Sequence, residues 1–479
     1  MVNTISKEKL NEKCGVFGIC APGKSAAKII FYGLQALQHR GQESAGIAVS
    51  DGENILVFKD LGLVSRVFNE QNIAPLQGHI GIGHTRYSAT GMNIWKNSQP
   101  LYHMFKNESF AIANNGNLTN TNEIRNELIR KGVKFDTTTD TEVIASLIGS
   151  SEKDNIEDAI KEMVSKIKGC YSILILTRDK IFGIRDPHGF RPLVLGNLDG
   201  DYVIASETCA LDIVDAKFVR EIDPGEIIIL DKDGARSQMV LSVDRISMCI
   251  FELIYFARPD SYIYGKNMFA IRHRLGQELA KECPADADIV ISVPDSGTPA
   301  AIGYSKESKI PYAEGFIKNR YVGRTFIQPE QKTREISVKL KLNPLRDIIC
   351  GKRLVVVDDS IIRGTTSKKI VKMLYDVGAR EVHLRITCPP LLYPCYYGVD
   401  MARRNEFIAN HKTLENIREF LKVDSLGYLS MDGLIKAVGE SKEKFCFACF
   451  NGEYPVPVSD NPEFNKHLIN KEKRVSSNA

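Results

Sequence analysis

Two neighbouring carboxylates, Asp358 and Asp359, stand directly after the short apolar run of residues 354–357. That run is rich in valine, which is typical of a strand buried on both faces of a parallel sheet. A turn with the sequence GTT (residues 364–366) follows and leads into a helix-like run. Ligands of open α/β sheets bind beyond the carboxyl ends of the strands, and backbone N–H groups that open a helix bind anions. The stretch therefore predicts a site where carboxylates hold sugar hydroxyls or a metal ion and the turn holds a phosphate.

A plain strand, turn and helix with two solvated aspartates is the alternative interpretation of this stretch. However, the stretch resembles the motif that binds 5-phosphoribosyl 1-pyrophosphate (PRPP) in the type I phosphoribosyltransferases. The resemblance implies that the two acids face the ribose hydroxyls and one Mg²⁺ ion per subunit, and that the loop after them holds the 5′-phosphate. It assigns PRPP binding to Asp358, Asp359, Ser360, Arg363, Gly364, Thr365 and Thr366.

A single cysteine, Cys14, marks an abrupt change from a polar stretch (residues 1–13) to the apolar sequence CGVFGI (residues 14–19). One interpretation is a frayed tail before an ordinary strand cysteine. The other is a propeptide that is removed, so that Cys14 becomes the first residue. A free α-amino group titrates near pH 8 and can then act as the general base for the adjacent thiol. An internal Cys14 has no such amine, and spacing alone leaves both interpretations open.

Several short motifs follow Cys14 in the chain. A helix is predicted over residues 32–39, and the further motifs are QESAGIAV (residues 42–49), GHTRYS (83–88), NNGNL (114–118) and TDTE (139–142). Together with residues 14–18 they resemble the glutaminase domain of the N-terminal-nucleophile amidotransferases, over about the first half of the chain. Residues 88–90 depart from the order of small residues that is frequent in that family, so no contact is assigned to them.

The resemblance gives each of these polar residues a chemical role. Cys14 would attack the amide of glutamine and form a thioester that water later cleaves. The Asn115 side-chain amide and the Gly116 backbone N–H would form the oxyanion hole, while Arg86 binds the carboxylate of glutamine and Asp140 its ammonium. Each residue alone has a simpler interpretation: a surface ion pair, a tight hairpin turn or a helix N-cap. Their joint occurrence favours the glutaminase.

A second strand-like run, residues 289–293, ends in the sequence PDSGTP (residues 294–299). In phosphoribosyltransferases the loop after the first strand contacts pyrophosphate, and the resemblance therefore assigns Asp295 and Ser296 to PRPP binding. It also makes Ser296 a magnesium ligand, together with Asp358 and Asp359. Oxygen ligands of this kind suit Mg²⁺ that bridges phosphates.

Residues 318–334 form the densest run of basic side chains in the second half of the chain. A solvated loop is the simple interpretation, but several of its residues are too apolar for a loop that stays in water. The run resembles the flexible loop of the glutamine PRPP amidotransferases, which closes over PRPP and completes a passage for ammonia. The resemblance assigns PRPP contacts to Lys318, Arg320, Tyr321 and Arg324.

The chain contains eleven cysteines. Cys446 and Cys449 form a C-x-x-C motif, which alone fits half of a zinc site, a redox pair or two unliganded thiols. Amidotransferases of the Bacillus type carry a [4Fe–4S] cluster, and Cys249, Cys395, Cys446 and Cys449 match the motifs of its four ligands. Four thiolates suit zinc as well; the resemblance favours iron–sulfur with a structural role. The remaining cysteines are predicted to be buried small apolar residues: Cys20, Cys170, Cys209, Cys283, Cys350 and Cys388.

The elements that must position these residues require at least two domains, because 479 residues exceed what one hydrophobic core usually supports. We expect a propeptide (residues 1–13), a glutaminase domain (14–245), a phosphoribosyltransferase domain (246–440) and a C-terminal segment (441–479). The expected fold is an α+β N-terminal-nucleophile hydrolase (an αββα sandwich) followed by an α/β domain with a parallel sheet and helices on both faces. The turn DPHGFRP (residues 186–192) is interpreted as a packing element.

The composition is that of an ordinary soluble protein, with 43% hydrophobic and 25% charged residues. A net charge of +4 gives no reason to expect nucleic acid or a membrane surface as a partner. No apolar run approaches the roughly 20 residues of a membrane span, and the N-terminus lacks the apolar region of a signal peptide. An odd number of dispersed cysteines disfavours a disulfide framework. We therefore expect a cytoplasmic protein.

The glutamine PRPP amidotransferase family is the expected family, over residues 14–455. The resemblance implies that glutamine and PRPP give 5-phosphoribosylamine, pyrophosphate and glutamate, in the first committed step of purine synthesis. It also implies feedback inhibition by purine nucleotides and a homotetramer. One rival, a PRPP-sensing regulator of transcription, predicts a basic DNA-binding segment and no complete glutaminase half. The other, a hexosamine-forming amidotransferase, predicts a sugar-isomerase second half.

Overall fold

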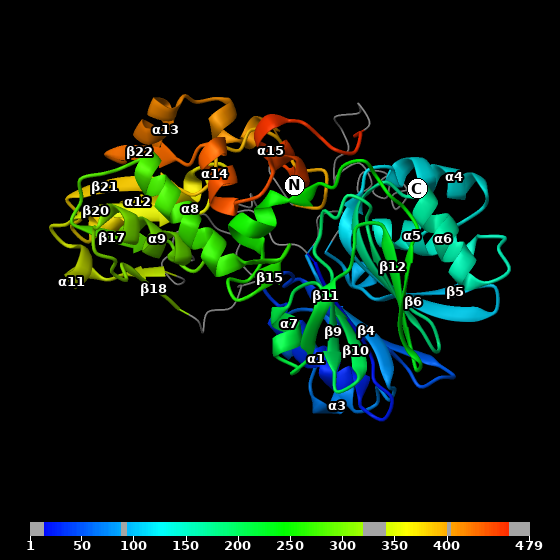
Figure 1. Ribbon diagram of the computed structural model, residues 1–479. Coiled ribbons are helices and arrows are strands. Elements are labelled where there is room, and N and C mark those ends of the chain that lie inside the picture. The colour runs from blue at the N-terminus through cyan, green and yellow to red at the C-terminus, as the bar shows by residue number, and fades with distance from the viewer. Residues whose placement is uncertain (1–13, 88–92, 320–341, 400–403, 459–479) are drawn as a thin grey trace, which may run out of the picture.

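The computed structural model describes residues 14–87, 93–319, 342–399 and 404–458 (Figure 1). The expected propeptide (residues 1–13) and residues 88–90 lie outside the described part of the chain, and so do Arg320, Tyr321 and Arg324 of the expected PRPP loop.

Two antiparallel sheets make up the first half of the chain. The seven-stranded sheet has the order β11 (Lys217–Glu221), β9 (Val194–Leu198), β10 (Asp201–Ala205), β1 (Gly15–Cys20), β4 (Ile80–Arg86), β2 (Ser44–Ser50) and β3 (Ile55–Leu61). The six-stranded sheet has the order β13 (Gly234–Met239), β12 (Glu226–Asp231), β8 (Ile181–Arg185), β7 (Gly169–Leu176), β6 (Glu108–Leu118) and β5 (Leu101–Phe105).

The two sheets face each other and each carries helices on its outer face. Strand β1 shows the pattern, because successive side chains of a strand point to opposite faces: Val16 lies in the core between the sheets and Phe17 in the core beneath α1 (Ala26–Ala36). The helices α4 (Thr121–Arg130), α5 (Asp140–Gly149) and α6 (Ile156–Lys166) cover the six-stranded sheet. This is the predicted αββα sandwich.

A parallel sheet organises the second half of the chain, in the order β17 (Ile289–Ser292), β20 (Arg353–Asp358), β21 (Glu381–Ile386) and β22 (Ser425–Tyr428). Its central valines are fully buried, as expected for parallel strands covered on both faces. The helices α8 (Met268–Glu282), α9 (Thr298–Ser308) and α14 (Met431–Val438) pack together, and α12 (Thr365–Asp376) packs with α13 (Leu414–Leu421). The predicted α/β phosphoribosyltransferase architecture is confirmed.

Shorter helices and strands connect the elements of these layers or lie at their borders. They are α2 (Val64–Val67), α3 (Glu70–Ile73), α7 (Cys209–Asp212), a π-helical turn η2 (Glu252–Phe256), β15 (Tyr262–Ile263), β16 (Lys266–Asn267), β18 (Phe316–Lys318), β19 (Leu342–Pro344), α11 (Arg346–Ile349) and α15 (Ala448–Asn451). Among the described residues, no helix is long and apolar enough to cross a membrane.

A two-stranded parallel ladder joins distant parts of the second half: β14 (Met248–Cys249) pairs with β23 (Phe445–Cys446). The connection between β13 and β14 contains residues 245 and 246, where the sequence places the domain boundary. The segment around residue 450 is held by packing, since the Phe251 and Phe450 rings stack with centroids 5.7 Å apart. The C-terminal segment is thus anchored to the start of the second half.

The six cysteines without a predicted role differ in burial. Cys20, Cys170, Cys209 and Cys388 are buried as predicted. The prediction is wrong for Cys350, which is exposed because it ends the short helix α11 at a surface turn, and Cys283 is only half-buried.

Candidate active sites and the cysteine cavity

Cys14 stands at the start of the central strand β1, beside the end of β4. The register pairs Gly15 with Thr85, so that Cys14 neighbours Arg86 on the next strand. The Cys14 thiol lies 3.4 Å from the Tyr87 carbonyl oxygen, and the charges of both Arg86 and Asp140 act on it. Asp140 opens helix α5, where its Oδ2 accepts a hydrogen bond from the Leu118 N–H at 3.2 Å. The structure thus brings the expected nucleophile and the two expected glutamine-binding residues together.

The expected oxyanion hole lies on strand β6. Asn115 is 1% exposed, and its Nδ2 has no hydrogen-bond partner among the described residues. Leaving a buried donor unsatisfied costs about 1–3 kcal/mol, and a donor kept in this state is what an oxyanion hole requires. At Gly116 a Cβ atom would lie 2.0 Å from the Cys170 carbonyl oxygen on β7, so no side chain fits there.

Burial sets the protonation of this site. It raises the pKa of the Cys14 thiol to about 11, against the smaller opposing effects of a backbone hydrogen bond at Tyr87 and of the Arg86 charge. The thiol is therefore neutral at physiological pH, and attack on an amide requires a base that removes its proton. Burial also raises the pKa of Asp140 to about 6, although the Leu118 N–H and Arg86 favour its ionised form. Asp140 is then ionised at neutral pH and neutral in mild acid.

This pKa predicts an acid limb in the use of glutamine. Below about pH 6, Asp140 takes up a proton. If Asp140 binds the glutamine ammonium, as the resemblance implies, KM for glutamine should rise as the pH falls through 6. Asp140→Asn should raise KM at pH 7.5 by about 10- to 100-fold, from the loss of a charge-assisted contact, and should remove this acid limb. Initial rates of glutamate release across pH 5–8 measure both effects. An unchanged limb in the variant would assign it to another group.

The second site lies at the carboxyl ends of β17 and β20. Because these parallel strands are neighbours, the loops after them meet. The Ser296 hydroxyl donates to Asp359 Oδ2 at 2.5 Å, and the Ser360 hydroxyl to Asp359 Oδ1 at 2.6 Å. The Asp359 N–H donates to Asp358 Oδ1 at 2.9 Å. Asp295 forms an ion pair with Lys318, which places these two expected PRPP residues together.

The turn after β20 has the features of an anion site. Gly364 has φ +75°, a left-handed conformation that favours glycine, and it directly precedes α12. The Thr365 hydroxyl at the first position of this helix is buried and has no hydrogen-bond partner among the described residues. Arg363 lies at the same turn and pairs with Glu406 at 2.7 Å. Helix N-terminus, free hydroxyl and guanidinium together suit a phosphate.

The oxygen-rich donor set at this site fits Mg²⁺. Carboxylate and hydroxyl oxygens of Ser296, Asp358 and Asp359 are ligands of the right kind. Among the described residues, however, no three His, Cys, Asp or Glu side chains are placed to hold a metal ion. Mg²⁺ usually takes several of its ligands from substrate phosphates and water, so it needs few protein ligands.

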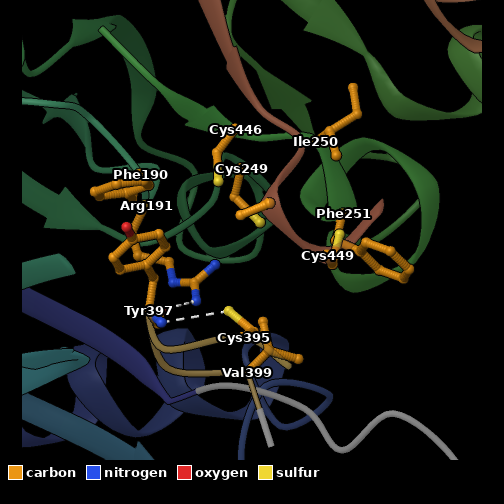
Figure 2. A pocket seen from close by; sticks show the side chains of 11 residues that line it. Phe190, Arg191, Cys249, Ile250, Phe251, Cys395, Tyr397, Val399, Cys446 and Cys449 are labelled. Carbon is orange, nitrogen blue, oxygen red and sulfur yellow. Dashed lines mark hydrogen bonds between the residues drawn. The ribbon is translucent and has the colours of Figure 1, made fainter. Parts of the chain in front are cut away.

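All four predicted cluster cysteines line one cavity (Figure 2). Cys249 and Cys446 are register partners in the β14–β23 ladder, Cys449 lies in α15, and Cys395 lies in the loop after β21. Burial raises the pKa of each of these thiols, so binding a metal must displace their protons. They share the cavity but do not close around a single ion. Four thiols on one cavity are a donor set that either a [4Fe–4S] cluster or zinc could take.

The turn at residues 186–192 does more than the sequence suggested. It packs as predicted, but Phe190 and Arg191 also line the cysteine cavity, and the Phe190 carbonyl oxygen accepts a hydrogen bond from the Cys249 N–H at 3.2 Å. Nothing in the turn itself indicates metal binding. An arginine between an aromatic residue and a proline is the only signal the sequence offers for a buried charge.

Residues 18–25 match the phosphate-loop pattern G-x-x-x-x-G-K-S and connect β1 to α1. Their lysine is engaged elsewhere: Lys24 pairs with Asp201 at 2.9 Å and donates to the Leu198 carbonyl oxygen at 3.2 Å. The strand also belongs to an antiparallel sheet, whereas phosphate loops follow strands of βαβ units. We therefore assign no nucleotide to this loop.

Comparison with known proteins covers nearly the whole chain. The family described as glutamine amidotransferase domain matches residues 84–212. The amidophosphoribosyltransferase of Synechococcus elongatus is 48% identical over 468 residues, 96% of this chain and 95% of its own. The chain belongs to the amidophosphoribosyltransferase family. Relatives of this name match both halves of the chain, which excludes the regulator and the hexosamine-forming enzyme as alternatives.

Two solved structures share the fold. The PRPP amidotransferase from Bacillus subtilis, complexed with ADP and GMP, has a TM-score of 0.88 and 45% identity over 94% of this chain and 98% of its own. A second structure, described as the allosteric regulatory enzyme of purine biosynthesis, has a TM-score of 0.90 and 44% identity over 95% of this chain and 99% of its own. The chain is thus an amidophosphoribosyltransferase by sequence and fold, and it catalyses the first step of purine biosynthesis from glutamine and PRPP.

Proposed function

We propose that the two reactions occur at the two sites described above, with Cys14 as the nucleophile after removal of residues 1–13. The observation that carries the first assignment is the buried Asn115 amide, which has no partner among the described residues. The α-amine of Cys14 takes the thiol proton, and the thiolate attacks the amide carbon of glutamine. Asn115 Nδ2 and the Gly116 N–H receive the charge that develops on the oxygen. The resulting α-ammonium returns this proton to the amide nitrogen, the C–N bond breaks, and ammonia leaves as the thioester forms. Water then cleaves the thioester and releases glutamate.

At the second site, Asp358 and Asp359 would accept hydrogen bonds from the ribose hydroxyls of PRPP. Thr365 and the N-terminus of α12 would hold its 5′-phosphate. Ser296, Asp358 and Asp359 would hold Mg²⁺, whose positive charge would stabilise the leaving pyrophosphate. Ammonia attacks C1, the C1–O bond to pyrophosphate breaks, and the nitrogen loses a proton to give the neutral amine. Lys318 belongs to the described part of the loop proposed to cover PRPP; Arg320, Tyr321 and Arg324 complete this proposal.

The mass of the purified protein's N-terminus tests the first assignment. A protein that starts at Cys14 supports the amine as the base. A protein that retains residues 1–13 and still hydrolyses glutamine would require another base and would overturn this part of the mechanism.

We also propose that Cys249, Cys395, Cys446 and Cys449 hold a [4Fe–4S] cluster of the Bacillus type. The convergence of four thiols on one cavity supports this. Such a cluster contributes iron–sulfur bonds that would tie the C-terminal segment to β14 at the start of the second half. Its role is structural, because these residues belong to neither of the two sites above.

Metal analysis should show this cluster directly. Anaerobically purified protein should contain iron and acid-labile sulfide in equal amounts, with broad brown absorbance. Cys446→Ser should lose most of the iron, while Cys209→Ser, a matched change at a buried cysteine in the first half, should keep it. Colourless protein that contains zinc would contradict the proposal.

The same proposal includes the inhibition of the enzyme, its oligomeric state and its location in the cell. The Bacillus subtilis relative is complexed with ADP and GMP, and we expect purine nucleotides to inhibit this enzyme too. We expect a homotetramer in the cytoplasm. Inhibition assays with ADP and GMP and analytical ultracentrifugation test the first two expectations.

A further inference from the structure

Arg191 is the one basic or acidic side chain besides the cysteine thiols among the described residues that line the cysteine cavity, and it alone carries a permanent charge. It is 1% exposed. Its guanidinium lies on the side of the cavity where Cys249 and Cys395 present their sulfur atoms (Figure 2). A fixed positive charge beside buried thiols favours their deprotonated form and any negatively charged group that they bind.

Two of the three nitrogen atoms of the Arg191 guanidinium form hydrogen bonds with other residues, and the third does not. Nη1 donates to Glu252 Oε1 at 3.3 Å, and Nη2 donates to the Tyr397 carbonyl oxygen. Nε is buried and has no hydrogen-bond partner among the described residues. Since arginine has five N–H donors in a rigid fork, fixing its two ends also fixes the direction of the third.

Glu252 is itself fixed by a second hydrogen bond, so it holds the Arg191 guanidinium in one orientation. Its other carboxylate oxygen accepts from Arg40 of the first half at 2.8 Å, and Glu252 and Arg40 are both fully buried. A backbone donor already points at one thiol, since the Tyr397 N–H lies 3.3 Å from Cys395 Sγ. The cavity wall therefore presents an N–H donor to sulfur and a fixed positive charge beside it.

We infer that Arg191 is the electrostatic partner of the group bound in the cysteine cavity, and that its guanidinium stabilises the negative charge of that group. The inference rests on the proposed iron–sulfur cluster. A [4Fe–4S] cluster with four thiolate ligands carries net negative charge, and hydrogen bonds and charge near the sulfurs set its stability and its reduction potential. Arg191 is thus a positioning residue for the cluster and touches neither substrate.

Two substitutions separate the charge from the donor geometry. Arg191→Met removes both, whereas Arg191→Lys keeps a positive charge and loses the guanidinium fork. Arg385→Lys is the matched control: Arg385 is 4% exposed and donates to backbone carbonyls and Ser425, away from the cavity. The readouts are the rate of iron release to a chelator, followed by visible absorbance, and the midpoint potential of the cluster.

In Arg191→Met, iron release should be about tenfold faster. The midpoint potential of the cluster should fall, because losing a cation disfavours the more negative, reduced cluster. We expect a tenfold change in the equilibrium constant for reduction, which is about 59 mV for a one-electron couple. Arg191→Lys should fall between this variant and the wild type, and Arg385→Lys should match the wild type. If Arg191→Met does not fold, the difference between the two lysine variants decides the question.

The outcomes separate this inference from the proposal on which it rests. Wild-type protein without iron and sulfide removes the cluster and the inference with it. Wild-type protein with a cluster, whose release rate and potential are unchanged in both Arg191 variants, overturns the inference alone. Equal effects in Arg191→Lys and Arg385→Lys would also overturn it, because they would report general loss of packing.

Discussion

Cys14→Ser should abolish synthesis from glutamine while leaving synthesis from added ammonium intact. Loss of the nucleophile should lower glutamine-dependent kcat by roughly 10⁴-fold or more, since groups that act together in covalent catalysis are not replaced by their neighbours. Serine is nearly isosteric, but its hydroxyl is far less acidic than a thiol and is a poorer nucleophile towards an amide. Added ammonium supplies ammonia directly, so its reaction with PRPP requires only the second site.

Cys20→Ser controls for the substitution itself, because Cys20 lies buried at the other end of the same strand and contacts no expected substrate atom. It should retain both activities. The measurement is phosphoribosylamine formation with each nitrogen source, under conditions where pyrophosphate release is followed in parallel. Equal loss of both activities in Cys14→Ser would mean that the first site also serves the second reaction.

Asp358→Ala combined with Asp359→Ala should have the opposite signature. Synthesis should fall by about 10³-fold or more with either nitrogen source, because the ribose hydroxyls and the oxygen ligands for Mg²⁺ are lost together. Glutamine hydrolysis should persist, since Cys14 and its partners stand on other sheets. Separate assays of glutamate and pyrophosphate release test this split.

The same sheet offers a matched pair of acids. Asp286 and Asp288 lie at the amino ends of its strands, opposite the predicted site. Both form ion pairs with Arg353 at the start of β20, at 2.5 Å and 3.0 Å. Removing both should leave PRPP chemistry unchanged, because the carboxyl ends of the strands are not touched. If this control lost as much synthesis as the variant at residues 358 and 359, the effect would come from folding rather than from the site.

The strands around the PRPP site were readable from sequence because buried parallel strands are continuous apolar runs. Residues 354–357 proved to be the centre of Arg353–Asp358, and the parallel register then brought Ser296 to Asp359 as expected. The motifs of the first half likewise predicted which residues meet around Cys14. For these residues, the sequence pattern predicted the contacts that the structure shows.

The helix predicted over residues 32–39 shows where such reasoning fails. The structure places α1 at Ala26–Ala36, and the following turn directs Arg40 inward to Glu252, a residue of the second half. A helical periodicity cannot reveal a buried ion pair whose partner lies 212 positions away. The place of Arg191 at the cysteine cavity was hidden for the same reason, because the cavity exists only when distant segments pair.

The ladder between β14 and β23 has a consequence for biosynthesis. A ribosome that has just made Cys249 must still translate nearly the whole second half before Cys446 and Cys449 emerge. At 5–20 residues per second this delay is on the order of 10 s or more. Until then a nascent chain offers only an incomplete set of thiols, so the proposed cluster, if present, could be completed only after residues 446–449 have been made.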